Sequence, residues 1–483
     1  MFESTSETSA RFSSFLAAVG VLAAAGACSL ADKPPRPDIL LITIDTLRAD
    51  AVGAYGAEEA RTPRIDQLAA GGTLYERAVT PMPLTRPAHF SLFTSRYPRE
   101  HGVVNNALSL PEDAETLPER LRESGYRTGA FVGVHLLSPA AGAAQGFDTF
   151  GDVGFDTKYR SARLVVDEAL DWLARQPRNA PIFLWVHLFD PHLPYEPPVD
   201  FVEGADPDLA ERYPNLSWRD FRAIARAEGG DLPGEILDYG LALYRAEVAY
   251  TDFEVGRLID GVDQLRGLDE TVVALTADHG ECFERGIYFE HADCLYRGAL
   301  RIPLILRHPS TFAAGQRSNH PVSLLDVAPT LLSAVQLPAE KSFRGEVLSG
   351  SVPGGRDRQI LVQYPLYQPR AARSRSRRAQ ALQSVAGDPV REPVLGRERV
   401  GLIGPDWKYI RGEPQAELFS EVGDEEENLA AIQPVVAERL EDELDRLLKN
   451  YPLHVLDAGL INEELRETLE ALGYIVPPEK PAP

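Results

Sequence analysis

Five uninterrupted apolar runs constrain the fold of this chain more than any other feature. They lie at residues 39–44, 129–134, 181–188, 271–276 and 302–306. A strand with apolar side chains on both faces must be covered on both faces, as in a parallel sheet flanked by helices. Amphipathic helical patterns separate the runs, at residues 62–71, 117–125 and 244–265. This alternation predicts an α/β/α sandwich with a mostly parallel central sheet.

Length and charge narrow the class of protein. With 483 residues the chain can bury a large core, and its formal net charge is −23. A nucleic-acid-binding protein needs a basic face that displaces counterions from phosphates, so we expect no nucleic-acid partner. The acidic balance otherwise bears on solubility and not on the fold.

The N-terminal residues predict an export signal. Arg11 precedes an apolar run at residues 12–27, which is too short to span a bilayer comfortably. We place the signal at residues 1–28 and a Pro-rich linker at residues 29–37. The small residues before Cys28 resemble a lipoprotein signal, in which a lipidated Cys28 attaches the protein to a membrane. This predicts a periplasmic or outer-membrane-associated lipoprotein. The alternatives are a secreted protein with an ordinary cleaved signal, or a start codon assigned too early.

Changes in residue composition and hydrophobic pattern along the chain predict its domains. A catalytic domain covers residues 38–350, with a polar insertion at residues 200–240. Short apolar runs with strand character predict a smaller antiparallel subdomain at residues 356–450, and residues 451–483 form a helical tail. After Cys28 only Cys282 and Cys294 remain. They either form a disulfide or stay as buried free thiols.

Polar side chains follow three of the apolar runs. Asp45 comes after the first run and Asp278 and His279 after the fourth, while His187, Asp190 and His192 lie at or past the end of the third. Ligands of such sheets bind beyond the carboxyl ends of the strands, so these side chains are expected at one edge. An Asp-His pair offers oxygen and imidazole ligands in one turn. Gly280 after the pair is expected to permit a sharp turn.

Thr85 precedes Pro87 in a further polar segment. It either caps the helix that Pro87 opens or acts as a nucleophile where helix N–H groups favour an anion. Asp45, taken alone, could equally be a helix N-cap.

Together these motifs resemble the sulfatase family of the alkaline phosphatase superfamily, over nearly all of residues 37–430. The resemblance implies an alkaline-phosphatase-like sandwich. It implies that a divalent metal is bound by four side chains and that His192 lies beside the leaving group or the anion. The four implied ligands are Asp45, Thr85, Asp278 and His279.

The sequence departs from standard sulfatases at the nucleophile. Thr85 stands where they convert a cysteine or serine into formylglycine, and its Cβ methyl prevents that aldehyde from forming. His89 stands at the arginine position of that motif, and Thr46 at the second aspartate of the usual pair. We therefore expect no formylglycine.

Two related families share the threonine. Nucleotide pyrophosphatase/phosphodiesterases place an asparagine that holds a phosphoryl oxygen where Asn106 falls. Phosphoethanolamine transferases place a histidine where His291 falls, twelve residues after His279. Asp190, His192 and His291 could bind a second metal, or the histidines alone could bind the anion. One or two divalent metal ions are expected, with Zn or Mn favoured and Ca or Mg left open.

These features predict a hydrolase of phosphate esters, diesters included, or of sulfate esters, acting through a covalent Thr85 intermediate, with phosphoesters preferred. The substrate is expected to be a small-molecule, glycan or lipid ester. One alternative is a sulfuric ester hydrolase that works without formylglycine. Another is a head-group phosphotransferase of the cell envelope, although such enzymes usually carry several N-terminal membrane helices. A binding module without activity is the remaining alternative.

Overall fold

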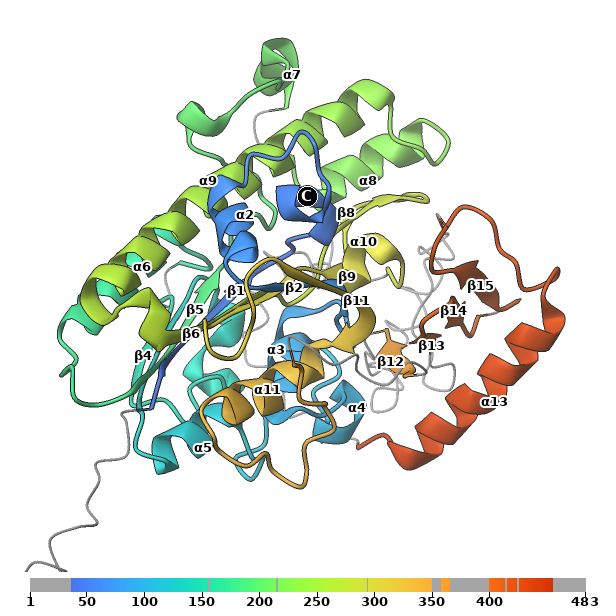
Figure 1. The fold of residues 1–483 in the computed structure, drawn as a ribbon. Coiled ribbons are helices and arrows are strands. Elements are labelled where there is room, and N and C mark those ends of the chain that lie inside the picture. Colours follow the sequence, from blue (N-terminus) through green and yellow to red (C-terminus); the bar gives the residue numbers. More distant parts are fainter. Residues whose placement is uncertain are drawn as a thin grey trace, which may run out of the picture. The chain divides into compact units, whose positions relative to one another are not determined.

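A mixed sheet of nine strands organises the computed structural model of this chain (Figure 1). The structure describes residues 36–154, 157–213, 216–292, 294–349, 358–364, 399–412, 415–423 and 425–454. The predicted export signal, Cys28 and most of the linker and tail lie outside these ranges. The strands are β1 (Asp38–Ile44), β2 (Thr73–Val79), β3 (Arg127–Val132), β4 (Thr149–Gly151), β5 (Ile182–Leu188), β6 (Thr271–Ala277), β9 (Arg301–Ile302), β10 (Leu304–Arg307) and β11 (Gln316–Ser323).

The strand order is β11-β2-β10-β6-β1-β5-β3-β4, with β9 paired to β2. The pairs β6-β1, β1-β5, β5-β3, β3-β4 and β2-β11 are parallel, whereas β10 is antiparallel to both of its neighbours. The predicted mostly parallel sheet is therefore confirmed. The apolar runs correspond to β1, β3, β5, β6 and β10, and β1, β5 and β6 are buried along their full length.

Helices cover both faces of this sheet (Figure 1). The helices α2, α6 and α9 lie on one face, and α3, α5 and α11 on the other. Their bounds are α2 (Pro63–Ala70), α3 (Thr85–Thr94), α5 (Leu117–Glu123), α6 (Ala162–Ala174), α9 (Gly234–Arg266) and α11 (Val327–Ala334), with a short α4 (Pro98–His101) after α3. In the described part of the chain no helix is both long enough and apolar enough to cross a bilayer.

Helix α9 begins earlier than its sequence pattern predicts. The amphipathic pattern starts at residue 244, but the helix starts at Gly234, after Pro233. It therefore takes in the end of the predicted insertion at residues 200–240. The remainder of that insertion forms α7 (Pro207–Arg212) and α8 (Trp218–Ala227). Helix α8 is capped by Ser217, whose hydroxyl accepts from the backbone N–H of Asp220.

A separate antiparallel sheet follows in sequence, as predicted. It has the order β12-β13-β14-β15 and is followed by helix α13. A third, two-stranded sheet is the β7-β8 hairpin, and Cys282 at its start is joined to Cys294 in a disulfide. The bounds are β12 (Ile360–Gln363), β13 (Val400–Ile403), β14 (Trp407–Ile410), β15 (Glu417–Ser420), α13 (Pro434–Asn450), β7 (Cys282–Glu284) and β8 (Ile287–Glu290).

Gly280 is required for close packing and not for a left-handed turn. It is absent from the positions of positive φ, so no left-handed conformation requires a glycine here. Its backbone N–H donates to the carbonyl of Ala299 at 2.8 Å. A Cβ placed on Gly280 would collide with the backbone oxygen of Gly298 in α10 (Arg297–Leu300). The segment that carries Asp278 and His279 therefore lies directly against the backbone of α10.

We expect Gly280→Ala to destabilise the protein by about 1–3 kcal/mol, because the collision is with backbone atoms that no rotamer change can relieve. Chemical denaturation would measure this loss. Gly234→Ala is the matched control, since no heavy atom lies within 4 Å of its added Cβ. Equal stability of the two variants would contradict this account of Gly280.

Candidate active site

Asp45, Asp278 and His279 meet at the carboxyl edge of two adjacent strands. In the β1-β6 register Ile44 lies opposite Ala277, so Asp45 and Asp278 follow paired positions. All three side chains are buried, and one ligand atom of each lies within 4.8 Å of the other two. His279 Nε2 is 3.7 Å from Asp45 Oδ1 and 3.5 Å from Asp278 Oδ2. Strand topology thus produces the cluster that the sequence predicts.

The donor atoms of this cluster fit a divalent cation. Both oxygens of Asp45, Oδ2 of Asp278 and Nε2 of His279 are buried without a hydrogen-bond partner. Burial raises the pKa of Asp45 and of Asp278 well above their usual range, and the negative charge of Asp45 raises that of Asp278 further. Buried carboxylates without partners are unfavourable unless a positive charge compensates them. Such a site is therefore suited to a metal.

The orientation of His279 supports the same assignment. Its Nδ1 lies 3.0 Å from the carbonyl oxygen of Gly280, which can only accept a hydrogen bond. Nδ1 therefore carries the proton, and Nε2 presents its lone pair to the two carboxylates. Metal-binding histidines are usually oriented in this way by a hydrogen bond from the second ring nitrogen.

Thr46, two residues past the end of β1, has an unusual backbone conformation. Its φ of 52° lies in the left-handed region, which a β-branched residue seldom adopts. Tyr244 of α9 holds this turn, because its hydroxyl donates to the carbonyl of Thr46 at 2.8 Å and accepts from the N–H of Arg48 at 3.0 Å. The Thr46 hydroxyl is buried without a partner. The turn places Thr46, which stands at the second aspartate position of the usual pair, directly after Asp45.

Thr85 is the first residue of α3, and Leu84 is the N-cap. The alternative in which Thr85 only caps the helix is wrong, because no side chain makes a cap hydrogen bond here. Its Oγ1 is fully buried and has no hydrogen-bond partner. His89 links Thr85 to the cluster, with Nδ1 2.8 Å from the Thr85 carbonyl and 3.6 Å from Asp278 Oδ2. A buried hydroxyl without partners beside a candidate metal site has the surroundings of a nucleophile.

Asn106 lies across the N-terminus of α3. Its Oδ1 accepts from the backbone N–H of Arg86 at 3.0 Å, while its Nδ2 is buried without a partner. The amide group is therefore oriented with its donors unused. The same bond engages the N–H of Arg86, so that helix amide is not available to an anion.

A hydrogen-bonded network behind the cluster assigns the protons of two further histidines. His89 donates from Nδ1 to the Thr85 carbonyl, and burial lowers its pKa, so its Nε2 accepts from the Thr43 hydroxyl at 3.1 Å. Trp185 Nε1 donates to the same Thr43 oxygen at 2.9 Å. The Thr43 hydroxyl has one proton, and the hydrogen bond to His89 uses it. His187 Nδ1, 3.1 Å away, must therefore donate to the Thr43 oxygen. His187 Nε2 then presents a lone pair 3.6 Å from Asp45 Oδ2.

His291 joins the site, as predicted, next to the cluster. Its ring stacks on that of His279 with centroids 4.2 Å apart, and the ring of His192 lies 5.3 Å away. Its Nδ1 is 3.0 Å from Oε1 of Glu281, a residue to which the sequence motifs assign no role. Burial raises the pKa of Glu281 to about 8. His192 directs Nδ1 to the carbonyl of Leu193 at 2.5 Å, and burial lowers its pKa to about 4.

Asp190 has a different environment from the one expected for a second metal ligand. Its Oδ2 accepts from the backbone N–H of Ala162 at the start of α6, at 2.7 Å. Burial raises its pKa to about 6, and a hydrogen bond with Glu247 of α9 opposes that rise. Within the described ranges Asp45, Asp278 and His279 are the one group of three side chains placed to hold a metal. The structure therefore does not bring Asp190, His192 and His291 together as a second site.

Removing a metal should expose the repulsion between the buried carboxylates. We expect a chelator to lower the unfolding temperature of the native chain, since a ligand at a hundred times its Kd stabilises by about 2.7 kcal/mol. Asp45→Asn should abolish this sensitivity. Under chelation it should also be more stable than the native chain, because one of two facing carboxylates has gone. Thermal unfolding with and without chelator would test this, and a chelator response retained by Asp45→Asn would contradict it.

Glu247 should make stability depend on pH. Burial, followed by the charge of Asp190, raises its pKa from 4.5 to about 9. A raised pKa means that its contribution to stability is complete below pH 4.5 and declines as pH rises towards 9. Glu247→Gln keeps an oxygen for the N–H of Glu196 and supplies donors to Asp190. This variant should gain stability over the native chain at alkaline pH, because the neutral amide puts no second negative charge beside Asp190.

Denaturant titrations across this pH range would measure the difference between the two proteins. Glu235→Gln is a control on the same helix, because Glu235 is exposed. Parallel pH profiles for the native chain and Glu247→Gln would show that Glu247 is not the group that titrates.

Comparison with solved structures supports the fold. A structure containing D-glucosamine-2-N,6-O-disulfate as substrate has a TM-score of 0.67 at 20% identity, covering 86% of this chain and 98% of the other. The phosphonate monoester hydrolase of Silicibacter pomeroyi also has a TM-score of 0.67, at 19% identity, covering 87% of this chain and 97% of the other. Both similarities are structural and extend over almost the whole of those proteins.

Comparison of sequences agrees. An ulvan-active sulfatase of Formosa agariphila is 26% identical over 447 residues, which are 82% of this chain and 83% of that protein. An N-acetylglucosamine-6-O-sulfatase of Bacteroides thetaiotaomicron is 23% identical and covers 64% of this chain and 70% of its own. The family model described as Sulfatase matches residues 37–337. Because this match covers more than half of the chain and includes Asp45, Thr85 and the Asp278-His279 pair, this ester hydrolase belongs to the sulfatase family.

Proposed function

We propose that this chain hydrolyses phosphate diesters and related monoanionic phosphoesters, with the unmodified Thr85 hydroxyl as nucleophile. The observation that carries the proposal is the buried Oγ1 of Thr85, which has no hydrogen-bond partner and starts α3 beside the Asp45, Asp278 and His279 cluster. The Cβ methyl of threonine excludes the formylglycine route. An alkoxide on an ordinary hydroxyl is the remaining nucleophile at this position.

The charges around Thr85 favour a monoanionic ester. The Arg86 guanidinium donates to the carbonyls of Leu136 at 2.6 Å and of Leu108 at 3.3 Å. Arg48 is paired with Asp50 at 2.8 Å and Glu284 at 3.0 Å. Both arginines are therefore engaged by protein groups. A dianionic phosphate monoester would leave more charge uncompensated than a diester or a phosphonate monoester would.

A divalent cation held by Asp45, Asp278 and His279 would lower the pKa of the Thr85 hydroxyl and polarise the ester. Zn or Mn suits the mixture of imidazole and carboxylate, while Ca or Mg remains the alternative. In the first step the Thr85 oxygen forms a bond to phosphorus and the bond from phosphorus to the alcohol oxygen breaks. Asn106 Nδ2 would donate to a phosphoryl oxygen, because its Oδ1 is already held by Arg86 N–H.

His192 and the Glu281–His291 pair can each accept and donate a proton during the reaction. The Glu281–His291 pair keeps a shared proton near neutral pH, because burial raises the pKa of Glu281 to about 8. That proton can pass to the departing alcohol. His192 is neutral with its Nδ1 proton directed to the Leu193 carbonyl, so Nε2 can accept the proton of the Thr85 hydroxyl in the first step and return it to the threonine when water cleaves the adduct. The Glu281–His291 pair, having given its proton to the alcohol, can recover one from that water. This differs from the expectation that His192 assists the leaving group.

A second candidate function is the hydrolysis of sulfate esters by the same threonine. The similarity to relatives named as sulfatases favours it. A sulfate monoester is also a monoanion, so the charge argument does not distinguish the two. The substrate-bound structure similar to this chain carries a sulfated sugar, and a phosphonate monoester hydrolase is similar to the same degree.

The test compares three aryl esters that share one leaving group: a bis-aryl phosphate, an aryl phosphonate monoester and an aryl sulfate. We expect kcat/KM to be highest for the phosphorus diester or phosphonate. Thr85→Ala should lower kcat by roughly 10⁴-fold or more, as removal of a covalent nucleophile does. Thr85→Ser should retain most of the activity, since it keeps the hydroxyl.

Arg317→Gln is a matched surface control, because Arg317 pairs with Glu76 on the far strand β2. Mass spectrometry of the quenched reaction should find the phosphoryl group on the peptide containing Thr85. Faster turnover of the aryl sulfate would favour the second candidate. Full activity of Thr85→Ala on every ester would overturn the assignment of the nucleophile.

A further inference from the structure

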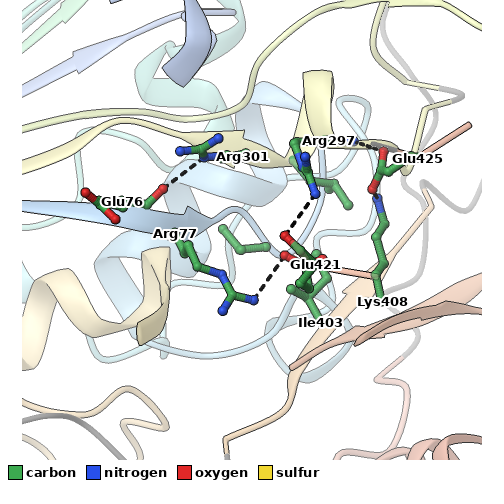
Figure 2. A pocket seen from close by; sticks show the side chains of 10 residues that line it. Glu76, Arg77, Arg297, Arg301, Ile403, Lys408, Glu421 and Glu425 are labelled. Atoms are coloured by element: carbon green, nitrogen blue, oxygen red, sulfur yellow. Dashed lines mark hydrogen bonds and ion pairs between the residues drawn. The ribbon is translucent and has the colours of Figure 1, made fainter. Parts of the chain in front are cut away.

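A cavity of about 200 Å³ lies between β2, α10 and the C-terminal antiparallel sheet (Figure 2). We call it the junction cavity. Four basic and three acidic side chains line it, together with three apolar ones. It belongs to none of the motifs that lead to the active site. The charged side chains come from strands far apart in sequence, β2 and β14 among them, so only the fold brings them together.

Each acidic side chain of the junction cavity already has a basic partner. Glu421 pairs with Arg77 at 3.0 Å, and Glu425 pairs with the buried Lys408 at 2.5 Å. Glu76 pairs at 2.7 Å with Arg317, which does not line the cavity. The carboxylates are therefore compensated without the two remaining arginines.

Arg297 and Arg301 are left with unused guanidinium donors. Arg301 donates from Nε to the carbonyl of Glu76 at 2.9 Å, and its two terminal nitrogens bond to none of the described residues. Arg297 makes one long bond, from Nη2 to the carbonyl of Glu421 at 3.3 Å, and its other guanidinium nitrogens likewise lack a partner among them. Figure 2 shows both side chains beside the same space as Arg77 and Glu421.

The two arginines are close enough to repel each other. Burial lowers the pKa of Arg301, and the positive charge of Arg297 lowers it further. Neither guanidinium is fully buried, and the charges of Asp50 and Glu76 partly offset that of Arg301, so the unused donors are open to an anion that enters the cavity. Guanidinium groups present paired N–H donors that match the oxygens of phosphate or sulfate.

We propose that the junction cavity binds a small tetrahedral oxyanion, phosphate or sulfate, between the guanidinium groups of Arg297 and Arg301. The cavity volume of about 200 Å³ gives room for a small oxyanion. The anion would connect α10 and β9 of the catalytic sheet to the C-terminal sheet, because Arg297 also contacts Glu421 and Glu425 there. The proposal does not depend on the substrate of the active site.

The test uses the full chain treated with chelator, so that a metal at the active site contributes no anion binding. Isothermal titration with inorganic phosphate, and separately with inorganic sulfate, should find one bound anion per chain at constant ionic strength. Chloride at the same ionic strength should give no comparable binding. The double variant Arg297→Gln, Arg301→Gln should weaken phosphate binding by about tenfold or more for each guanidinium removed.

Arg446→Gln is the matched control, because Arg446 of α13 is exposed and neither it nor its partner Glu443 lines the cavity. It should leave the affinity unchanged. If circular dichroism shows the double variant to be unfolded, Arg301→Lys replaces it and should show intermediate affinity, since it keeps the charge and loses the paired donors. The proposal is overturned if the chelated native chain binds neither anion, or if the arginine variants bind phosphate as tightly as the native chain does.

Discussion

The juxtaposition of two buried carboxylates at the ends of adjacent parallel strands is the constraint on which the rest of the site depends. Asp45 and Asp278 follow paired positions of β1 and β6, and both are almost fully buried. Their mutual repulsion opposes folding. A cation bound between them would attract both carboxylates, so the net electrostatic interaction at this point would become favourable. The surrounding residues are arranged around that charge. His279 directs a lone pair towards it, and Thr85 at the start of α3 is connected to Asp278 through His89.

The neighbouring polar groups restrict one another's protonation. A single hydroxyl, that of Thr43, accepts hydrogen bonds from Trp185 and His187 and donates one to His89. His89 in turn holds the carbonyl of Thr85. The position of the nucleophile is thus set by bonds that begin inside β1, so the strand orients both Asp45 and, indirectly, Thr85. Such preorganisation is what an active site requires of its supporting residues.

Sequence alone could predict the parts of the active site that lie at the ends of strands or within short sequence motifs. Asp45, Asp278 and His279 follow apolar runs, and in a parallel sheet the ends of such runs meet. It could not predict the role of Glu281, because that depends on how the β7-β8 hairpin returns His291 to the cluster. Its place past the end of the third apolar run makes Asp190 a candidate ligand for a second metal, but its carboxylate bonds to the start of α6. Strand β11 carries polar residues and Pro321 at the edge of the sheet, and such edge strands lack the apolar pattern.

Helix α9 has a consequence for how enzymes of this kind can change specificity. Its 33 residues extend about 50 Å, and they contact several functional segments in succession. Gly240 packs against Phe289 of the hairpin, Tyr244 holds the turn at Thr46, and Glu247 holds the loop after His192. The segment before the helix is not independent of these contacts, because Phe221 of α8 stacks on Phe289 of the same hairpin with ring centroids 4.0 Å apart. An insertion or deletion between Gly240 and Glu247 would rotate these contacts out of register with one another, so variation in length, and any change of specificity that comes with it, should lie outside this part of the helix.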